Sequence, residues 1–437
     1  MKLFFRKAVP TIPFVFVVLI SATSSAPATP ELFTYIADGR DVLEIFSGDR
    51  DKYPDAIPLI ALANLSDANL AFTLDVHRQL ANESDVTNVV FSPLSLIYAL
   101  VMTYAGARGE TKNQLRELLH LGNLSDDDIN RTFRGWLWAG ANNTNGSVLA
   151  IANRLYVGRN YGLNPEYSQQ VQHYFNSTVR QVDFFKEGDA TRKGINSWVE
   201  EKTHGKIRHL LPVPLDPSSS VVLINAIYFR GVWQFKFDTH ETIKDYFFVS
   251  PTEKMPVDMM QMLNPFPYNY WPELRARMVG LPYSGARFAM FLILPDPGVQ
   301  LESVENKLNV STLRRMQREL EEVNVTLVLP RFKLEEGGSM RGVLTGLGCG
   351  DLLDPDYADL GAMTTSHRVA LSDIVHKAVI EVSEEGTEAA TASVAMLTRT
   401  IDPRNRLVMV NRPFLFYITD TVTGFILFWG RVVVPHS

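Results

Sequence analysis

Three residues whose side chains could carry out hydrolysis stand in well-formed local patterns: Ser92, Asn225 and His376. A serine activated by a histidine is a common nucleophile in acyl-transfer enzymes. However, Ser92 precedes Pro93 at the head of a predicted helix, and no Gly-x-Ser-x-Gly turn surrounds it. The local sequence therefore argues against a hydrolytic centre, and we expect that the protein is not an enzyme.

The remaining side chains that could hold a metal or cofactor show no pattern typical of such a site. None of the histidines has the short, regular spacing of a metal-ligand pair. The nine histidines are His77, His120, His173, His204, His209, His240, His367, His376 and His436. The chain also lacks a glycine-rich phosphate loop. We therefore expect neither a metal nor another cofactor.

The only cysteine is Cys349, so an intrachain disulfide is impossible. A lone cysteine can be a nucleophile or can form an intermolecular bridge. It stands where an apolar residue would close a short helix, and small apolar character suits a buried thiol. We expect Cys349 to be buried and inert.

Length indicates one large domain with an N-terminal extension, and net charge excludes some classes of partner. The chain has 437 residues, more than most single domains, but it contains no internal repeat and no low-complexity linker. We expect a mixed α/β domain over residues 59–437. The net charge of −6 argues against a nucleic acid or an anionic membrane as partner.

Residues 1–26 have the pattern of a secretory signal peptide. The basic start consists of Lys2, Arg6 and Lys7. An apolar run at 14–20 follows, which is too short to span a bilayer, and small residues come after it. Because Pro27 disfavours cleavage just before it, the expected cut lies between residues 22 and 28. The alternative is a short membrane anchor; the signal peptide predicts secretion.

Residues 27–58 form a mixed, acidic extension before the main domain. Such a terminal segment is either disordered or docks a partner, and disorder is the favoured interpretation. Nine Asn-x-Ser/Thr sequons support an extracellular glycoprotein. They begin at Asn64, Asn82, Asn123, Asn130, Asn142, Asn145, Asn176, Asn309 and Asn324.

Most of the remaining chain alternates between predicted helices and strands. Helices are expected at 69–80, 94–105, 111–121, 125–138, 166–175, 189–203, within 302–321, and at 340–347. Strands are expected at 148–157, 179–184, 221–229, 247–249, 276–281, 289–294, 324–329, 376–382, 414–418, 425–429 and 431–434. The apolar run at 221–229 is typical of a strand covered on both faces in the middle of a sheet.

The segment between the strands at 376–382 and 414–418 has no regular pattern of its own. Residues 389–393 are small and carry almost no apolar bulk, and the later part contains Asp402-Pro403, typical of an exposed loop. A loop this long in a compact domain is usually functional or disordered. If it became a strand, alternate residues would share one face. Those residues are Thr387, Ala389, Thr391, Ser393, Ala395 and Leu397, and Glu388 falls on the opposite face.

The sequence of this segment resembles the reactive loop of the inhibitory serpins. Its start, Glu384-Glu385-Gly386-Thr387-Glu388-Ala389-Ala390, resembles the serpin hinge, and Asn411-Arg412-Pro413-Phe414 resembles the anchor beyond the loop. The resemblance extends from about Ala61 to Pro435. It includes the motifs at 88–95, 223–233 and 376–382. Several separated motifs in the same order make the resemblance specific.

The resemblance implies an α+β serpin fold with three β-sheets, about eight or nine helices and an exposed reactive-centre loop at about 384–410. Ser92, Asn225 and His376 would form a hydrogen-bonded network beneath the central sheet, where two strands must part. Trp233 would lie under the top of that sheet. Arg331 would pair with Glu384 in the hinge. The implied hinge residues are Glu384, Glu385, Gly386, Thr387, Glu388, Ala389, Ala390, Thr391 and Ala392.

The implied function is suicide inhibition of an extracellular serine protease by a monomeric chain. The expected reactive bond is Arg399–Thr400, because a basic residue suits a trypsin-like protease; the alternative bond is Thr400–Ile401. The alternative function is a non-inhibitory serpin acting as carrier, chaperone or storage protein. Small residues in the hinge argue against that alternative.

The resemblance also bears on activation by heparin. Heparin-activated serpins carry several basic residues on the helix that corresponds to 125–138. Here this segment contains only Arg131 and Arg134. Heparin activation is therefore not expected.

Overall fold

The computed structural model of the chain describes residues 59–81, 88–142, 147–366, 369–387 and 405–436. The expected signal peptide, the extension up to residue 58 and both candidate reactive bonds lie outside the described residues. The domain boundaries therefore stay predictions at the N-terminal side.

The described residues contain nine α-helices, in agreement with the eight or nine expected. They are α2 Leu59–Ala81, α3 Pro93–Gly106, α4 Gly109–Leu118, α5 Asp126–Asn142, α6 Pro165–Phe175, α7 Gly188–Lys202, α8 Leu301–Glu305, α9 Val310–Arg318 and α10 Arg341–Gly346. Two short 3-10 turns are η1 Thr239–Glu241 and η2 Asp351–Leu353. None of the helices in the described part of the chain is both long and apolar enough to cross a bilayer.

The strands fall into the order that the sequence predicts, with additions at 254–271, 332–339, 386–387 and 406–409. They are β1 Val89–Phe91, β2 Val148–Gly158, β3 Val179–Val182, β4 Val221–Val232, β5 Ile243–Phe248, β6 Lys254–Trp271, β7 Ala276–Pro282, β8 Phe288–Pro295, β9 Glu321–Pro330, β10 Phe332–Ser339, β11 Leu371–Val382, β12 Gly386–Thr387, β13 Arg406–Met409, β14 Phe414–Asp420 and β15 Ile426–Val432. The α+β class is confirmed.

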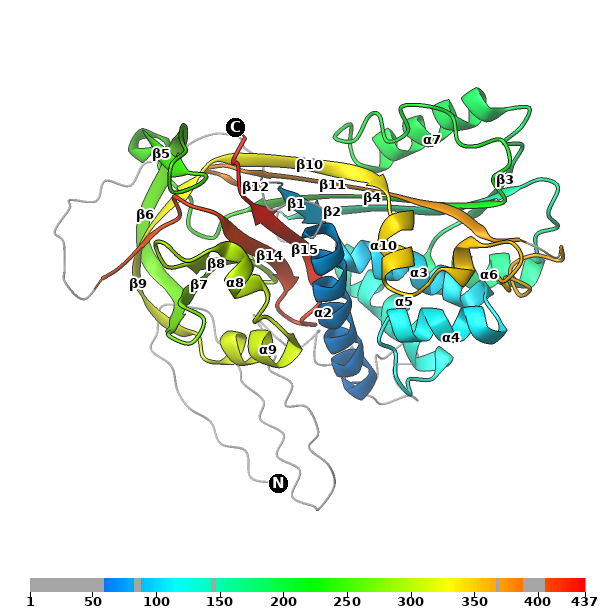
Figure 1. Cartoon of the computed structure of the whole chain (residues 1–437), viewed down its shortest axis with the longest axis horizontal. Coiled ribbons are helices and arrows are strands. Elements are labelled where there is room, and N and C mark those ends of the chain that lie inside the picture. Colours follow the sequence, from blue (N-terminus) through cyan, green and yellow to red (C-terminus); the bar gives the residue numbers. More distant parts are fainter. Residues whose placement is uncertain (1–58, 82–87, 143–146, 367–368, 388–404, 437) are drawn as a thin grey trace, which may run out of the picture.

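These strands form two hydrogen-bonded sheets among the described residues, where three were expected. The larger sheet runs β1-β15-β14-β8-β7-β6-β9-β13, with β5 also on β6. Strand β6 pairs with β5 at its start, with β9 along its middle and with β7 at its end. This one long strand therefore joins what would otherwise be two separate sheets (Figure 1).

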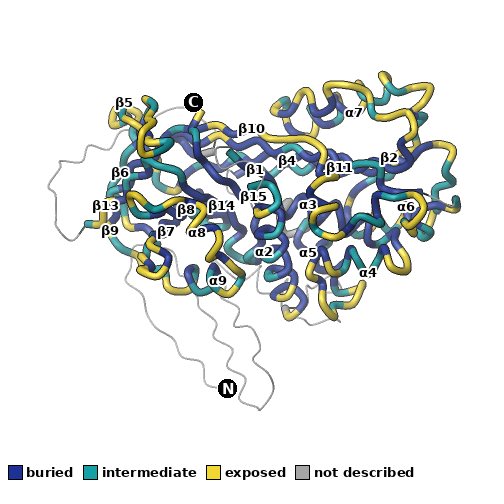
Figure 2. The backbone as a smooth tube through the Cα atoms, viewed as in Figure 1, coloured by how far each residue is buried: buried dark blue, intermediate teal, exposed yellow. Residues whose placement is uncertain are grey.

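The smaller sheet positions the candidate site, and its order is β10-β11-β4-β2-β3. Helix α7 lies on one face, whereas α3, α5 and α6 lie on the other (Figure 1). Strand β4 is buried on both faces, as its apolar run predicts. Leu223, Ile227 and Phe229 belong to the main core, and Val222, Ile224 and Ala226 pack in a second cluster with residues of α7. Figure 2 shows the buried path of these central strands.

The start of α3 follows from local chemistry. Ser92 caps the helix, because its hydroxyl accepts a hydrogen bond from the Ser95 backbone N–H at 3.2 Å. Pro93 occupies the first turn, where a missing N–H costs nothing. The sequence prediction of a buried helix opened by Ser92-Pro93 is confirmed.

Several elements differ from the sequence prediction, and β15 is one strand where two were expected, at 425–429 and 431–434. Helix α2 begins at Leu59 and not near residue 69, so Asp67 lies inside the helix, and its carboxylate lies 2.9 Å from the Arg314 guanidinium. Strand β6 was not predicted, because its prolines are typical of turns. Residues 406–409, expected in the exposed loop, form β13 parallel to β9.

Candidate functional site

The centre of the smaller sheet is a parallel pair of strands, β11 and β4. His376 lies opposite Asn225, and Val379 lies opposite Tyr228. A further strand that entered between them by a tight turn from the end of β11 would be antiparallel to both of them. Antiparallel ladders have well-aligned hydrogen bonds and are slightly more stable per residue than parallel ones. The sheet therefore has a favourable position for one more strand.

The chain after β11 turns back toward this position. Gly386 bridges to Ser383 in a tight turn, and then pairs with Val232 of β4; Thr387 pairs with Gly231. The φ angle of Gly386 is 145°, and a Cβ there would lie 1.9 Å from the Gly231 carbonyl oxygen. Only glycine fits this turn. The hinge therefore already forms the first two residues of an antiparallel strand on β4.

Trp233 stabilises this turn through two hydrogen bonds to its backbone. Its indole N–H donates to the Ser383 carbonyl at 2.9 Å, and its backbone N–H donates to the Glu385 carbonyl at 3.0 Å. The indole stacks on Tyr283 with ring centroids 4.4 Å apart. The buried tryptophan therefore fixes the exit angle of the chain from β11.

Two carboxylates of the hinge are bound by side chains around the sheet end. Glu384 lies 3.4 Å from the Arg331 guanidinium and accepts from the Thr242 hydroxyl at 2.8 Å. Glu385 lies 2.6 Å from the Lys236 ammonium. Because Arg331 and Lys236 are partly exposed, each ion pair contributes only about 0–1 kcal/mol. Sequence reasoning missed Lys236 and Thr242, which no local motif marks.

The structure brings Ser92, Asn225 and His376 together beneath the parallel pair. The His376 Nδ1 atom contacts the Asn225 side-chain oxygen, and the Ser92 backbone N–H donates to His376 Nε2 at 3.2 Å. His376 is therefore neutral, with its proton on Nδ1. The Ser92 hydroxyl caps α3, and within the described part of the chain the imidazole is hydrogen-bonded to the Ser92 backbone N–H and not to this hydroxyl, so the pair lacks the geometry of a serine–histidine nucleophile.

Two further residues complete the network. The Asn225 side-chain amide donates to the Ser95 carbonyl and hydroxyl oxygens, each at 2.7 Å, and to the Asn153 side-chain oxygen. Sequence reasoning missed Ser95 and Asn153; a polar residue inside the apolar strand β2 was the available signal. Parting β11 from β4 must break the contact between His376 and Asn225, so the network opposes opening of the sheet.

Burial makes this network sensitive to acid. Burial lowers the pKa of His376 from 6.5 to about 3, because the charged imidazolium cannot be solvated there. The stability from this group is complete above about pH 6.5 and is lost as the pH falls toward 3. We expect about 2 kcal/mol of this contribution to be lost at pH 5. Urea unfolding at pH 7.5 and 5 measures it, with His376→Gln as the control; equal pH dependence of both proteins would contradict the assignment.

The sequons occupy different environments. Asn64, Asn123, Asn176, Asn309 and Asn324 are exposed. Asn130 is only 7% exposed, so a glycan there is incompatible with the packing of α5. Asn82 and Asn145, and the side chain of Asn142, lie outside the described residues.

The other candidate sites add no chemistry. Cys349 is buried, and burial raises the pKa of its thiol to about 12, with the carboxylate of Asp351 adding to the shift. The thiol is therefore a weak nucleophile. No cluster of three His, Cys, Asp or Glu residues that could hold a metal occurs among the described residues.

The fold and the site define a protein with a smaller mixed sheet whose parallel pair, β11 and β4, lies beside a hinge that pairs with the end of β4. The serpin family model, described as serine protease inhibitor, matches residues 67–435. The chain belongs to the serpin family.

Similar proteins include an elastase inhibitor and a thyroxine-binding globulin. Serpin B11 of Homo sapiens is 36% identical over 398 residues, covering 86% of this chain and 100% of that protein. Leukocyte elastase inhibitor of Homo sapiens is 35% identical over 382 residues, with coverages of 86% and 100%. The crystal structure of human thyroxine-binding globulin with its ligand has a TM-score of 0.79 and 28% identity, covering 86% of this chain and 100% of that one.

Proposed function

We propose that this serpin inhibits a serine protease by inserting its cleaved loop between β11 and β4. The observation that carries this proposal is the register of the hinge. Gly386 and Thr387 already pair antiparallel with Val232 and Gly231. Continued one residue at a time, this register places Ser393 opposite Asn225 and brings Leu397 to Val221, the first residue of β4.

The inserted strand would also pair with β11, with no shift of β11 relative to β4. The bridge between Ser383 and Gly386 sets the turn on that side. Continued from this turn, the register places Ser393 opposite His376. Because His376 and Asn225 are already partners across the sheet, both neighbours accept the new strand in their present alignment. Insertion therefore requires the two strands to separate sideways, which breaks their ladder and the contact between His376 and Asn225, but it requires no shift of register.

Side chains of the loop match the two faces of the sheet. In this register, alternate residues from Thr387 to Leu397 point to the main core together with Asn225 and Phe229. They are small or apolar, as a buried position requires. Glu388 falls on the other face between Arg230 and the exposed Glu381. The one charge in the first part of the loop therefore does not enter the core.

An uncleaved loop is tethered at both ends, which resists insertion. Cleavage releases one end, and roughly ten additional ladder hydrogen bonds at ~1 kcal/mol net each give a driving force on the order of 10 kcal/mol. A protease still acylated to the loop would be carried along and distorted. The chain itself supplies no catalytic residue, so the protein is not an enzyme in this proposal.

The proposed target is an extracellular trypsin-like protease, cleaving at Arg399–Thr400. A trypsin-like pocket gains a charge-assisted hydrogen bond with the arginine. The elastase inhibitors among the relatives support the alternative bond Thr400–Ile401 and an elastase-like target. The alternative function is that of a non-inhibitory carrier, and the similarity to the structure of thyroxine-binding globulin supports it.

We also propose that the protein is secreted and monomeric and is not activated by heparin. The leader pattern and the exposed sequons support secretion. On α5, Arg131 lies 3.7 Å from the Asp127 carboxylate, which reduces the positive charge of that helix further.

Mass spectrometry of the peptide released by trypsin tests the reactive bond. We expect Thr400 as its first residue, and we expect Arg399→Ala to abolish complex formation with trypsin. Arg404→Ala is the matched control and should leave the complex intact, since Arg404 lies too late in the loop. A peptide that begins at Ile401, together with inhibition of an elastase by Arg399→Ala, would assign the alternative bond.

A further inference from the structure

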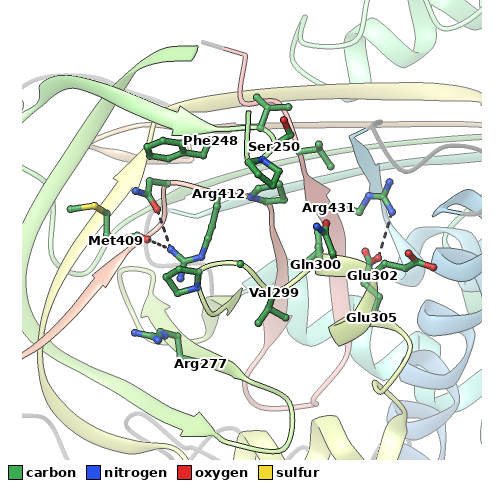
Figure 3. A pocket seen from close by; sticks show the side chains of 18 of the residues that line it. Phe248, Ser250, Arg277, Val299, Gln300, Glu302, Glu305, Met409, Arg412 and Arg431 are labelled. Atoms are coloured by element: carbon green, nitrogen blue, oxygen red, sulfur yellow. Dashed lines mark hydrogen bonds and ion pairs between the residues drawn. The ribbon is translucent and has the colours of Figure 1, made fainter. Parts of the chain in front are cut away.

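A pocket of about 610 Å³ lies on the larger sheet, away from the hinge. Its walls are β13 with residues 411–413, the turn between β5 and β6, and the segment 297–302 (Figure 3). Its volume is in the range of about 300–1,000 Å³ that small-molecule sites occupy. Nothing in the inhibitory mechanism uses this pocket.

Most of the wall is apolar. The apolar lining includes Phe248, Pro251, Val299, Leu301, Met409 and Val433. These side chains come from separate parts of the chain and surround the pocket on several sides. An apolar body bound here would be removed from water over much of its surface.

Arg412 supplies a positive charge with unused donors. Its Nε–H donates to the Pro295 carbonyl at 2.8 Å. Its Nη1 donates to the Met409 carbonyl at 3.3 Å and to the Asn411 side-chain oxygen at 3.1 Å. Its Nη2 has no acceptor among the described residues. The guanidinium is therefore fixed in place with one nitrogen left for a ligand.

The charge of Arg412 is not neutralised by its surroundings. The nearby carboxylate, Asp296, is already bound by the Arg277 guanidinium and by the Tyr270 hydroxyl. Burial, and then the charge of Arg277, lower the pKa of Arg412 to about 10. Figure 3 shows Arg412 with Arg277 on the same side of the pocket. This end of the pocket favours an anion.

The end of the pocket opposite Arg412 does not favour an anion. Arg431 lies 3.5 Å from Glu305, so its charge is paired, and Glu302 adds a carboxylate at that wall. A second negative group on a ligand would meet repulsion there. The charge distribution thus selects one negative group, bound near Arg412.

We propose that this pocket binds a small amphipathic monoanion, with a carboxylate on Arg412 and an apolar body against Phe248, Val299 and Met409. The proposal does not depend on protease inhibition. The guanidinium that would hold the ligand also holds the Met409 carbonyl at the end of β13. Bound ligand should therefore raise the melting temperature of the intact chain.

Isothermal titration calorimetry of the full chain with dodecanoate, below its micelle concentration, tests the proposal. We expect saturable binding at one site. Dodecyltrimethylammonium, which has the same chain and the opposite charge, should bind at least about tenfold more weakly. Equal binding of both probes, or no saturable binding of dodecanoate, would contradict the proposal.

Variants locate the site. Arg412→Gln should weaken dodecanoate binding by about tenfold or more, because it removes the charge-assisted contact. Met409→Trp should also weaken it by filling the pocket while the charge stays. Arg315→Gln is the control, since it removes an exposed arginine on α9 that pairs with Glu273. Affinity unchanged in Met409→Trp, with a normal unfolding transition, would place any binding elsewhere.

Discussion

Incubation of the Thr387→Arg variant with a trypsin-like protease is expected to give cleaved chain and free, active enzyme. Thr387 is the second hinge residue that pairs with β4, after Gly386, and it lies opposite Gly231. The register places its side chain toward the core during insertion, and an unpaired arginine there costs several kcal/mol. Insertion would stop near its start, and hydrolysis of the acyl-enzyme would then release the protease before it is distorted. We expect the yield of covalent complex to fall at least about tenfold.

The matched control is Glu388→Arg. It introduces the same side chain one residue later, where the register points to the other face of the sheet. This variant should keep most of the complex formation. Full complex yield in Thr387→Arg, or equal loss in both variants, would contradict the register.

Cleavage of the loop between Ala395 and Arg399 is expected to raise the melting temperature by on the order of 10 °C or more. The driving force of insertion is on the order of 10 kcal/mol. A chain of this size has an unfolding entropy of roughly 0.8 kcal/mol/K, from ~2.1 cal/mol/K per residue. Calorimetry before and after limited proteolysis measures the shift. An ordinary loop that is cut leaves stability unchanged or lower.

The Thr387→Arg variant serves as the control for this measurement as well. Cut at the same bond, it should gain much less stability than the wild-type chain, because its strand cannot enter the sheet. A melting temperature of the cut wild-type chain that equals that of the intact one would favour the non-inhibitory function.

Elements with strong local signals could be predicted from the sequence. Ser92-Pro93 caps and opens α3, and the apolar run of β4 is covered on both faces, as both patterns indicate. The hinge glycine also has a local reason, since Gly386 has a φ of 145°. Each of these features depends on a few neighbouring residues.

Contacts between distant parts of the chain could not be predicted in this way. Lys236 and Thr242 bind the hinge carboxylates from about 140–150 residues away. Asn153 joins the network under the sheet from the middle of β2. A polar residue within an apolar strand indicates a buried partner, but only the fold identifies that partner.

The continuous strand β6 explains why two of the three expected sheets are hydrogen-bonded to one another in the structure. Strand β6 contains Pro265 and Pro267, which lie opposite Asn324 and Glu322 on β9. Prolines usually interrupt interior strands, so this segment has the sequence pattern of a turn. Because β6 nevertheless continues through all of its partners, two of the three expected sheets are joined.

The most direct test of the central claim is denaturing gel electrophoresis of the wild-type chain after incubation with trypsin. Insertion with a trapped acyl-enzyme predicts a band that resists SDS, with the combined mass of protease and chain minus the released C-terminal peptide. Complete cleavage of the chain, with no such band with trypsin or with elastase and with the protease fully active, would contradict the account.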